Sequence, residues 1–119
     1  MKKFRRSRIV VGHLDKAHWA AIESRLTVGA RFYPDVLAAD VGASQTAAMA
    51  LLLGLFETGV LDMEWAVYHE DHHVLDRAYK DGFQPVPFHC AICDAWVESR
   101  DDLKYELRGH LREPVQLVD

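Results

Sequence analysis

The chain has 119 residues, the size of one domain or of one small domain with an appended module. Half of its residues are hydrophobic and its net charge is −4, a composition typical of a folded protein and not of a disordered one. The longest apolar run, residues 47–56, is about ten residues long, whereas a transmembrane helix needs about twenty. The basic start is not followed by the apolar stretch of a secretory signal, so the sequence predicts a cytoplasmic protein.

Charge is divided unevenly along the chain. Residues 1–31 contain eight Lys or Arg and two acidic residues, a net charge of +6, whereas residues 32–119 contain six and sixteen, a net charge of −10. A basic arm on an acidic body predicts an anionic partner, either DNA or an acidic protein face. A solubilising tail is the alternative interpretation. The arm residues expected to contact DNA are Lys2, Lys3, Arg5, Arg6 and Arg8.

Residues 9–44 begin with Ile-Val-Val at 9–11, which predicts a short strand or an extended lead-in. Asp15 is placed to cap a helix that ends at residues 27–29. Pro34 is suited to the first turn of a second helix, which we expect to run to about Asp40 and to be broken by Gly42.

A third helix and a strand follow. Ser44 can cap a helix from Gln45 to about Thr58, and Gly59 stands where a left-handed residue closes a helix. Apolar and polar residues then alternate over residues 61–69, which predicts a half-buried strand.

The sequence around this glycine turn, residues 37–44 followed by Ala48 and Leu51, resembles the core of a winged helix-turn-helix of the MarR type. Small Ala38 would let two helices cross closely, and Gly42 would supply the turn between them. The resemblance covers about residues 15–69. It implies a winged-helix domain at residues 15–80 after a basic arm at residues 1–14, and a dimeric, DNA-binding regulator.

The third helix departs from that pattern. It lacks Arg, Lys and Asn, so Gln45 and Thr46 are its only side chains suited to contact DNA. A helix that is apolar nearly all round is normally buried on more than one side. We therefore expect another element or another protein chain to cover it, with Met49 and Leu53 in the protein interface.

The C-terminal third contains Phe88, Cys90, Cys93, Val97 and Leu103, followed by Glu106 and His110 four residues apart. This series resembles a degenerate ββα zinc finger of the two-Cys two-His class. Ser99 followed by Asp102 is similar to a capping box and predicts a helix over about residues 100–111, within a module at residues 86–119. The resemblance implies Zn²⁺ held by Cys90, Cys93 and His110, with Glu106 at the position of the first histidine.

The residues themselves support a metal site, because two thiolates two residues apart can bind one Zn²⁺ from a tight turn. They leave the fourth ligand open, and the alternatives to Glu106 are His89, His69, His72 and His73. A buried, reduced cysteine pair is the other interpretation of the cysteines. For residues 69–73, the alternative to a metal-binding role is a solvated polar loop. No βαβ pattern surrounds the cysteines, which argues against a thioredoxin-like redox centre.

The sequence thus predicts an α+β, mainly helical fold, a winged helix-turn-helix with a small C-terminal ββα module. It shows no Ser-His-Asp order, phosphate-binding glycine loop or paired-carboxylate motif, so we expect no enzyme. The expected function is a zinc-binding, nucleic-acid-associated regulator of the transcription type. The alternative is an adaptor or small subunit that docks on a protein partner through the third helix and the acidic finger. Trp96 is then expected in the protein interface, with a place in the core as the other interpretation.

Overall fold

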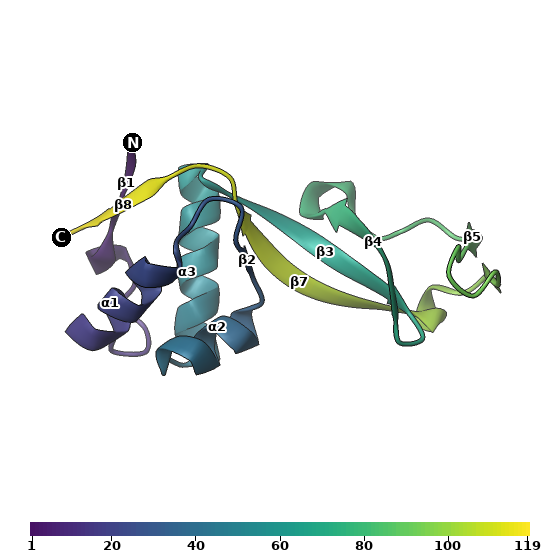
Figure 1. The fold of residues 1–119 in the computed structure, drawn as a ribbon, viewed down its shortest axis with the longest axis horizontal. Helices are drawn as coiled ribbons and strands as arrows, with labels where there is room; N and C mark the ends of the chain where they lie inside the picture. The colour runs from purple at the N-terminus through teal and green to yellow at the C-terminus, as the bar shows by residue number, and fades with distance from the viewer. The chain divides into compact units, whose positions relative to one another are not determined.

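The computed structural model describes all residues, 1–119, as three helices and eight strands in three sheets (Figure 1). Helix accounts for 34% of the residues and strand for 33%. The expectation of a mainly helical fold is therefore wrong, and the protein is α+β with prominent sheets. The chain forms two compact units: unit 1 comprises Met1–Asp62 and Gly109–Asp119, and unit 2 comprises Met63–Arg108.

All three helices belong to unit 1, with the bounds α1 (Lys16–Arg25), α2 (Pro34–Val41) and α3 (Gln45–Thr58). Each begins or ends where the sequence predicts. The side chains of Asp15 and Ser44 accept hydrogen bonds from the first turns of α1 and α3, and Gly42 and Gly59 end α2 and α3 with φ of 72° and 86°. No single helix is long and apolar enough to span a membrane, and α2 with α3 pass that test only as a pair bent by 115° at their junction.

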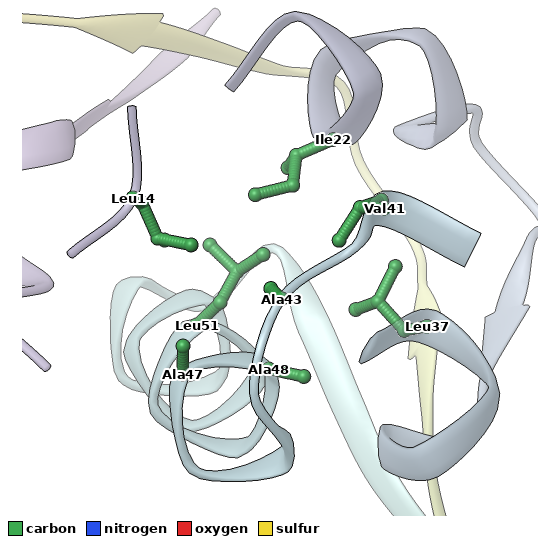
Figure 2. Close-up of a pocket in the computed structure, with 8 residues that line it drawn as sticks. All are labelled: Leu14, Ile22, Leu37, Val41, Ala43, Ala47, Ala48 and Leu51. Carbon is green, nitrogen blue, oxygen red and sulfur yellow. The ribbon is translucent and has the colours of Figure 1, made fainter. Parts of the chain in front are cut away.

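The core of unit 1 lies where the three helices meet. Figure 2 shows side chains from α1, α2, α3 and the segment before α1 pointing into one shared seam. Every residue that lines it is apolar: Leu14, Ile22, Leu37, Val41, Ala43, Ala47, Ala48 and Leu51. The seam offers no polar group to hold a ligand, so it is a packed core and not a binding site.

The basic arm is folded into unit 1. Strand β1 (Lys2–Arg5) pairs in parallel with β8 (Val115–Val118), so these two segments lie side by side in Figure 1. A 3-10 helix over Arg6–Arg8 follows, and the predicted strand or lead-in at residues 9–11 is not in a sheet. Phe4, within β1, is only 1% exposed.

The largest sheet has the strand order β2-β7-β3-β4. Its strands are β2 (Arg31–Phe32), β3 (Leu61–His69), β4 (His72–Ala78) and β7 (Leu103–Leu111). The strand predicted over residues 61–69 is confirmed at both ends. Strands β3 and β7 each contribute residues to both units. The third sheet pairs two short strands of unit 2, β5 (Phe88–His89) and β6 (Trp96–Val97), in antiparallel.

The helix expected over residues 100–111 is wrong. A 3-10 helix over Arg100–Asp102, capped by Ser99, leads directly into β7. Leu103, Tyr105, Leu107 and Leu111 fall at alternate positions of this segment, with Gly109 between the last two, which suits a strand with one buried face. The ββα finger is therefore not formed, and residues 109–119 belong to unit 1, whereas the two cysteines belong to unit 2.

Candidate functional site

The structure brings together three metal-binding side chains within unit 2: His69, Cys90 and Cys93. One ligand atom from each lies within 4.8 Å of the other two. His69 ends β3 and is 8% exposed, Cys90 follows β5 and is fully buried, and Cys93 is exposed. The group therefore joins a strand of the large sheet to a turn more than twenty residues further along the chain.

The two cysteines are presented by the turn between β5 and β6. The backbone N–H of Cys90 donates to the carbonyl of Ala95, and the N–H of Asp94 donates to the carbonyl of Cys90, both at 2.8 Å. Asp94 adopts a left-handed conformation with φ of 62°, which Asp tolerates better than most side chains. This tight turn holds both sulfur atoms on the side of His69.

The spacing of the donors suits a tetrahedral ion. The sulfur of Cys93 lies 3.4 Å from Nδ1 of His69. A tetrahedral Zn²⁺ with a Zn–S bond of about 2.3 Å and a Zn–N bond of about 2.0 Å would set its sulfur and nitrogen ligands about 3.5 Å apart. The His69, Cys90 and Cys93 group could therefore hold a metal ion.

The surroundings favour a thiolate at Cys90. A hydrogen bond from the backbone N–H of Cys93, helped by His69 and by the N–H of Ile92, overcomes burial and lowers the pKa of Cys90 to about 6. The backbone N–H of Ala95 lowers the pKa of Cys93, but burial and the neighbouring Cys90 outweigh it and raise that pKa above 9.0. One thiolate is thus available near neutral pH, and a bound cation would stabilise the second.

The other predicted ligands lie elsewhere. Glu106 and His110 are both on β7, where residues four apart are separated by about 13 Å, so one ion cannot bind both. His110 belongs to unit 1 and lies opposite Arg31 in the sheet, with its Nδ1 3.2 Å from the guanidinium of Arg112. Neither joins the cysteines.

Two further histidines that the sequence offered as ligands are engaged with carboxylates. Nε2 of His89 lies 2.6 Å from Asp94, and Nε2 of His73 lies 2.6 Å from Asp76. His72 lies directly opposite His69 in the β3–β4 hairpin. The polar segment at residues 69–73 is therefore a hairpin turn and the strand residues beside it.

Unit 2 has a small apolar core beside the metal group. Val67, Val97 and Leu103 are buried together. Half-buried apolar side chains pack against them: Trp65, Val74, Leu75, Val86, Phe88 and Tyr105. His69 and Val67 share one face of β3, because side chains two residues apart on a strand point the same way. A metal ion would thus fasten the turn of Cys90 and Cys93 beside this core.

The opposite face of the same sheet carries a charge network that the sequence analysis did not identify. The guanidinium of Arg108 lies 2.7 Å from Glu64 and 2.6 Å from Asp76, and its side chain is only 8% exposed. His73 extends the network through Asp76. The signal in the sequence was the set of charged residues alternating with the apolar positions of β3, β4 and β7.

The basic arm is largely neutralised within unit 1. Three of its five cations pair with acidic side chains: Lys2 with Glu113 at 3.3 Å, Arg6 with Asp119, and Arg8 with Glu57 at 2.8 Å, whereas Arg5 donates to the backbone oxygen of Asp119. Lys3 is exposed on β1. Cations that are paired with carboxylates attract phosphates less strongly, so this pairing makes the arm less suited to bind DNA.

The outer face of α3 is uncharged and open, with polar residues in its first turn and apolar residues beyond them. Gln45, Thr46 and Leu53 are exposed, and Met49 is half-buried. A surface groove runs along this face, lined by Val11, Pro34, Gln45, Thr46, Met49, Ala50 and Leu53. Phe56, one turn beyond Leu53, is 44% exposed. The groove thus contains none of the cations or carboxylates of unit 1.

Trp96 lies on β6 and is 66% exposed, with its ring 5.1 Å from that of His89. It is a surface residue of unit 2 and not part of its core.

Comparisons with protein-family models, with curated proteins and with solved structures find no match to this chain.

Proposed function

We propose that this protein is a zinc-binding, non-enzymatic interaction module that pairs with a second copy of itself through the outer face of α3. Zinc would stabilise the fold of unit 2, and the apolar face of α3 in unit 1 would form the contact between the two copies. The observation that carries the proposal is the groove along α3, which is apolar where a DNA-reading helix would carry Arg, Lys or Asn.

Zinc is the metal that the donor set favours. Imidazole nitrogen and thiolate sulfur are its preferred ligands, whereas Mg²⁺ and Ca²⁺ prefer oxygen. Unit 2 spans Met63–Arg108 and has a small apolar core, so an ion that joins β3 to the β5–β6 turn would add folding free energy that its packing lacks. This role requires only binding, and it agrees with the expectation that the protein is not an enzyme.

The spacing of the apolar residues on α3 supports a helix as the occupant of the groove. Met49, Leu53 and Phe56 follow one another at intervals of four and three residues, which is the spacing of a coiled-coil seam, and the polar Thr46 extends the series by three residues. Ala50 beside this stripe would let a second helix approach closely. The stripe can therefore pack against its own copy in an isologous contact.

The charges at the ends of α3 favour an antiparallel pair. Its first turn has no acidic residue and its last turn has no basic residue, whereas Glu57 lies in the last turn. In an antiparallel pair, the partially positive start of each helix would lie near the partially negative end of its partner. The same geometry would place Thr46 of one copy beside Phe56 of the other, across the two-fold axis.

The order of α1, α2, a glycine turn, α3 and β3 is the order that the resemblance to a winged helix-turn-helix implies, and in that family the third helix reads DNA. The side chains argue for a different use of that framework. Unit 2 has ten acidic and five basic residues, a net charge of −5, and Lys2, Arg6 and Arg8 of the arm in unit 1 contact carboxylates. Such a charge distribution repels phosphates, so we assign the α3 face to protein and not to nucleic acid.

The test measures the mass of the zinc-loaded protein in solution by size-exclusion chromatography with light scattering. We expect a dimer for the natural chain and a monomer with unchanged far-ultraviolet circular dichroism for Leu53→Glu. The matched control is Val28→Glu, because Val28 is a similarly exposed apolar residue of unit 1 outside the groove, and this variant should remain a dimer.

A natural chain that is monomeric at every concentration would overturn the proposal. Salt-sensitive binding of duplex DNA that Leu53→Glu abolishes and Val28→Glu retains would also overturn it, and would assign the α3 face to nucleic acid instead.

A further inference from the structure

The donor group of His69, Cys90 and Cys93 supplies three ligands, whereas structural zinc sites are almost always four-coordinate. We propose that His72 is the fourth ligand, so that a histidine pair on the β3–β4 hairpin and the cysteine pair on the β5–β6 turn enclose one Zn²⁺. This inference rests on the proposed zinc site and goes beyond it by assigning the coordination sphere.

The sheet register places His72 on the correct face. His69 and His72 are directly opposite each other in the antiparallel pair β3–β4, with Glu70 and Asp71 as the turn between them. Residues directly opposite on antiparallel strands point to the same face, with Cβ atoms about 5 Å apart. Because His69 points into the metal group, the imidazole of His72 begins on the same face of the hairpin.

The two turns present their donors in the same way. His69 and His72 are separated by two residues across a tight turn, as are Cys90 and Cys93. Each pair can therefore occupy two corners of a tetrahedron from one side of the ion. The imidazole of His72 is half-buried and is not among the three donors that already lie within 4.8 Å, so binding requires a rotation of this side chain.

The neighbouring histidines are less suited to the fourth position. His73 points to the opposite face of the hairpin, where it contacts Asp76 at 2.6 Å and packs against the ring of Tyr68. His89 is held by Asp94, also at 2.6 Å. Of the remaining groups, the carboxylate of Glu70 is the competing ligand, because it lies in the hairpin turn and its charge acts on Cys93.

Zinc affinity and coordination of the full chain test the assignment. The protein is stripped of metal and titrated with Zn²⁺ against a chromophoric chelator, and X-ray absorption of the zinc-loaded form counts sulfur and nitrogen ligands. We expect one ion with two sulfur and two nitrogen ligands. His72→Ala should weaken zinc binding by about 100-fold or more, beyond the loss typical of residues that only support a ligand. His73→Ala is the matched control and should bind zinc like the natural chain.

A substitution that keeps a ligand separates coordination from a merely structural role. His72→Cys should restore tight binding and change the coordination to three sulfurs and one nitrogen, with a stronger sulfur-to-metal charge-transfer band when Co²⁺ replaces zinc. A structural role for His72 would leave the sulfur count at two.

The outcomes distinguish the assignment of His72 as a ligand from the proposal that the protein binds zinc. A natural chain that takes up no zinc would overturn both. A natural chain that binds one zinc, with undiminished affinity in His72→Ala, would overturn the assignment of His72 alone. Loss of binding in Glu70→Gln together with retention in His72→Ala would overturn it in favour of a carboxylate ligand.

Discussion

The ring of Phe4 lies directly against α3 at Gly54, where a Cβ atom would sit 2.8 Å from two ring carbons. Phe4 is 1% exposed, so its ring has no free space into which it can move. A residue from the basic N-terminal segment is thus part of the core of unit 1. The segment packs as a strand and is not a solubilising tail.

Gly54→Ala should therefore destabilise the protein, although alanine normally favours a helix over glycine by about 1 kcal/mol. Crowding against Phe4 should exceed that gain and lower the free energy of unfolding by about 1–2 kcal/mol, measured by chemical denaturation. Phe4→Leu should recover part of the loss in the Gly54→Ala background, since leucine leaves room for the added methyl group. An increase in stability on Gly54→Ala alone would contradict this packing.

Removal of metal should affect unit 2 and spare the helices. Treatment with a chelator should change the fluorescence of Trp65 and Trp96, which lie in unit 2, and leave the far-ultraviolet helix signal nearly constant, because every helix lies in unit 1. Cys90→Ser should reproduce the chelated state and then respond no further to chelator. Identical spectra with and without chelator would exclude a structural metal.

Loss of Arg108 should be costly because it leaves Glu64 and Asp76 without their shared cation. The Arg108 side chain is 8% exposed and that of Glu64 is 15% exposed, so Arg108→Met should lower the free energy of unfolding by about 3 kcal/mol. Asp76 is 35% exposed, and Asp76→Asn should cost only about 1 kcal/mol. Chemical denaturation at neutral pH measures the loss of stability in both variants. Equal losses would contradict the expectation that solvent screens the charge of Asp76.

The same network predicts a dependence on pH. Burial acts to raise the pKa of Asp76, but the hydrogen bond with His73 and the charge of Arg108 together hold that pKa below its ordinary value of 3.8. A carboxyl with a lowered pKa stabilises the folded state above its unfolded pKa, and this contribution is lost as the pH falls through the folded pKa. The stability difference between the natural chain and Asp76→Asn should therefore shrink as the pH falls below about 4. A difference that grows as the pH falls through that range would have the wrong sign.

Local signals predicted the first half of the fold well. Asp15 and Ser44 cap α1 and α3 through contacts with their own first turns, and Gly42 and Gly59 end α2 and α3 in a left-handed conformation. These signals depend on a few adjacent residues and need no knowledge of the rest of the chain. The alternation of residues 61–69 predicted β3 for the same reason.

In the C-terminal third, short-range sequence patterns predicted a helix where the structure has a strand. Leu103, Glu106 and His110 fit the positions of a finger helix, but Leu103, Tyr105, Leu107 and Leu111 also follow the two-residue period of a strand. Pairing with β2 and β3 decides the outcome, and such pairing is not visible in a short window of sequence. The same limit applies to the metal group. The spacing of Cys90 and Cys93 was enough to identify them as ligands. His69 was only one of several alternatives, because it reaches the cysteines through the fold and not through its position in the sequence.

The parallel pairing of β1 with β8 has a consequence for folding. Lys2 lies opposite Val115 and Arg5 opposite Val118, so these contacts join residues more than a hundred positions apart. During synthesis, residues 2–5 must wait without their partner strand until the ribosome has released residues 115–118. Contacts of such high sequence separation form slowly, because the entropy of closing the intervening loop is lost before the pairing is gained. We expect the closing of this two-stranded sheet to be among the last steps of folding, after α1, α2 and α3 have packed together.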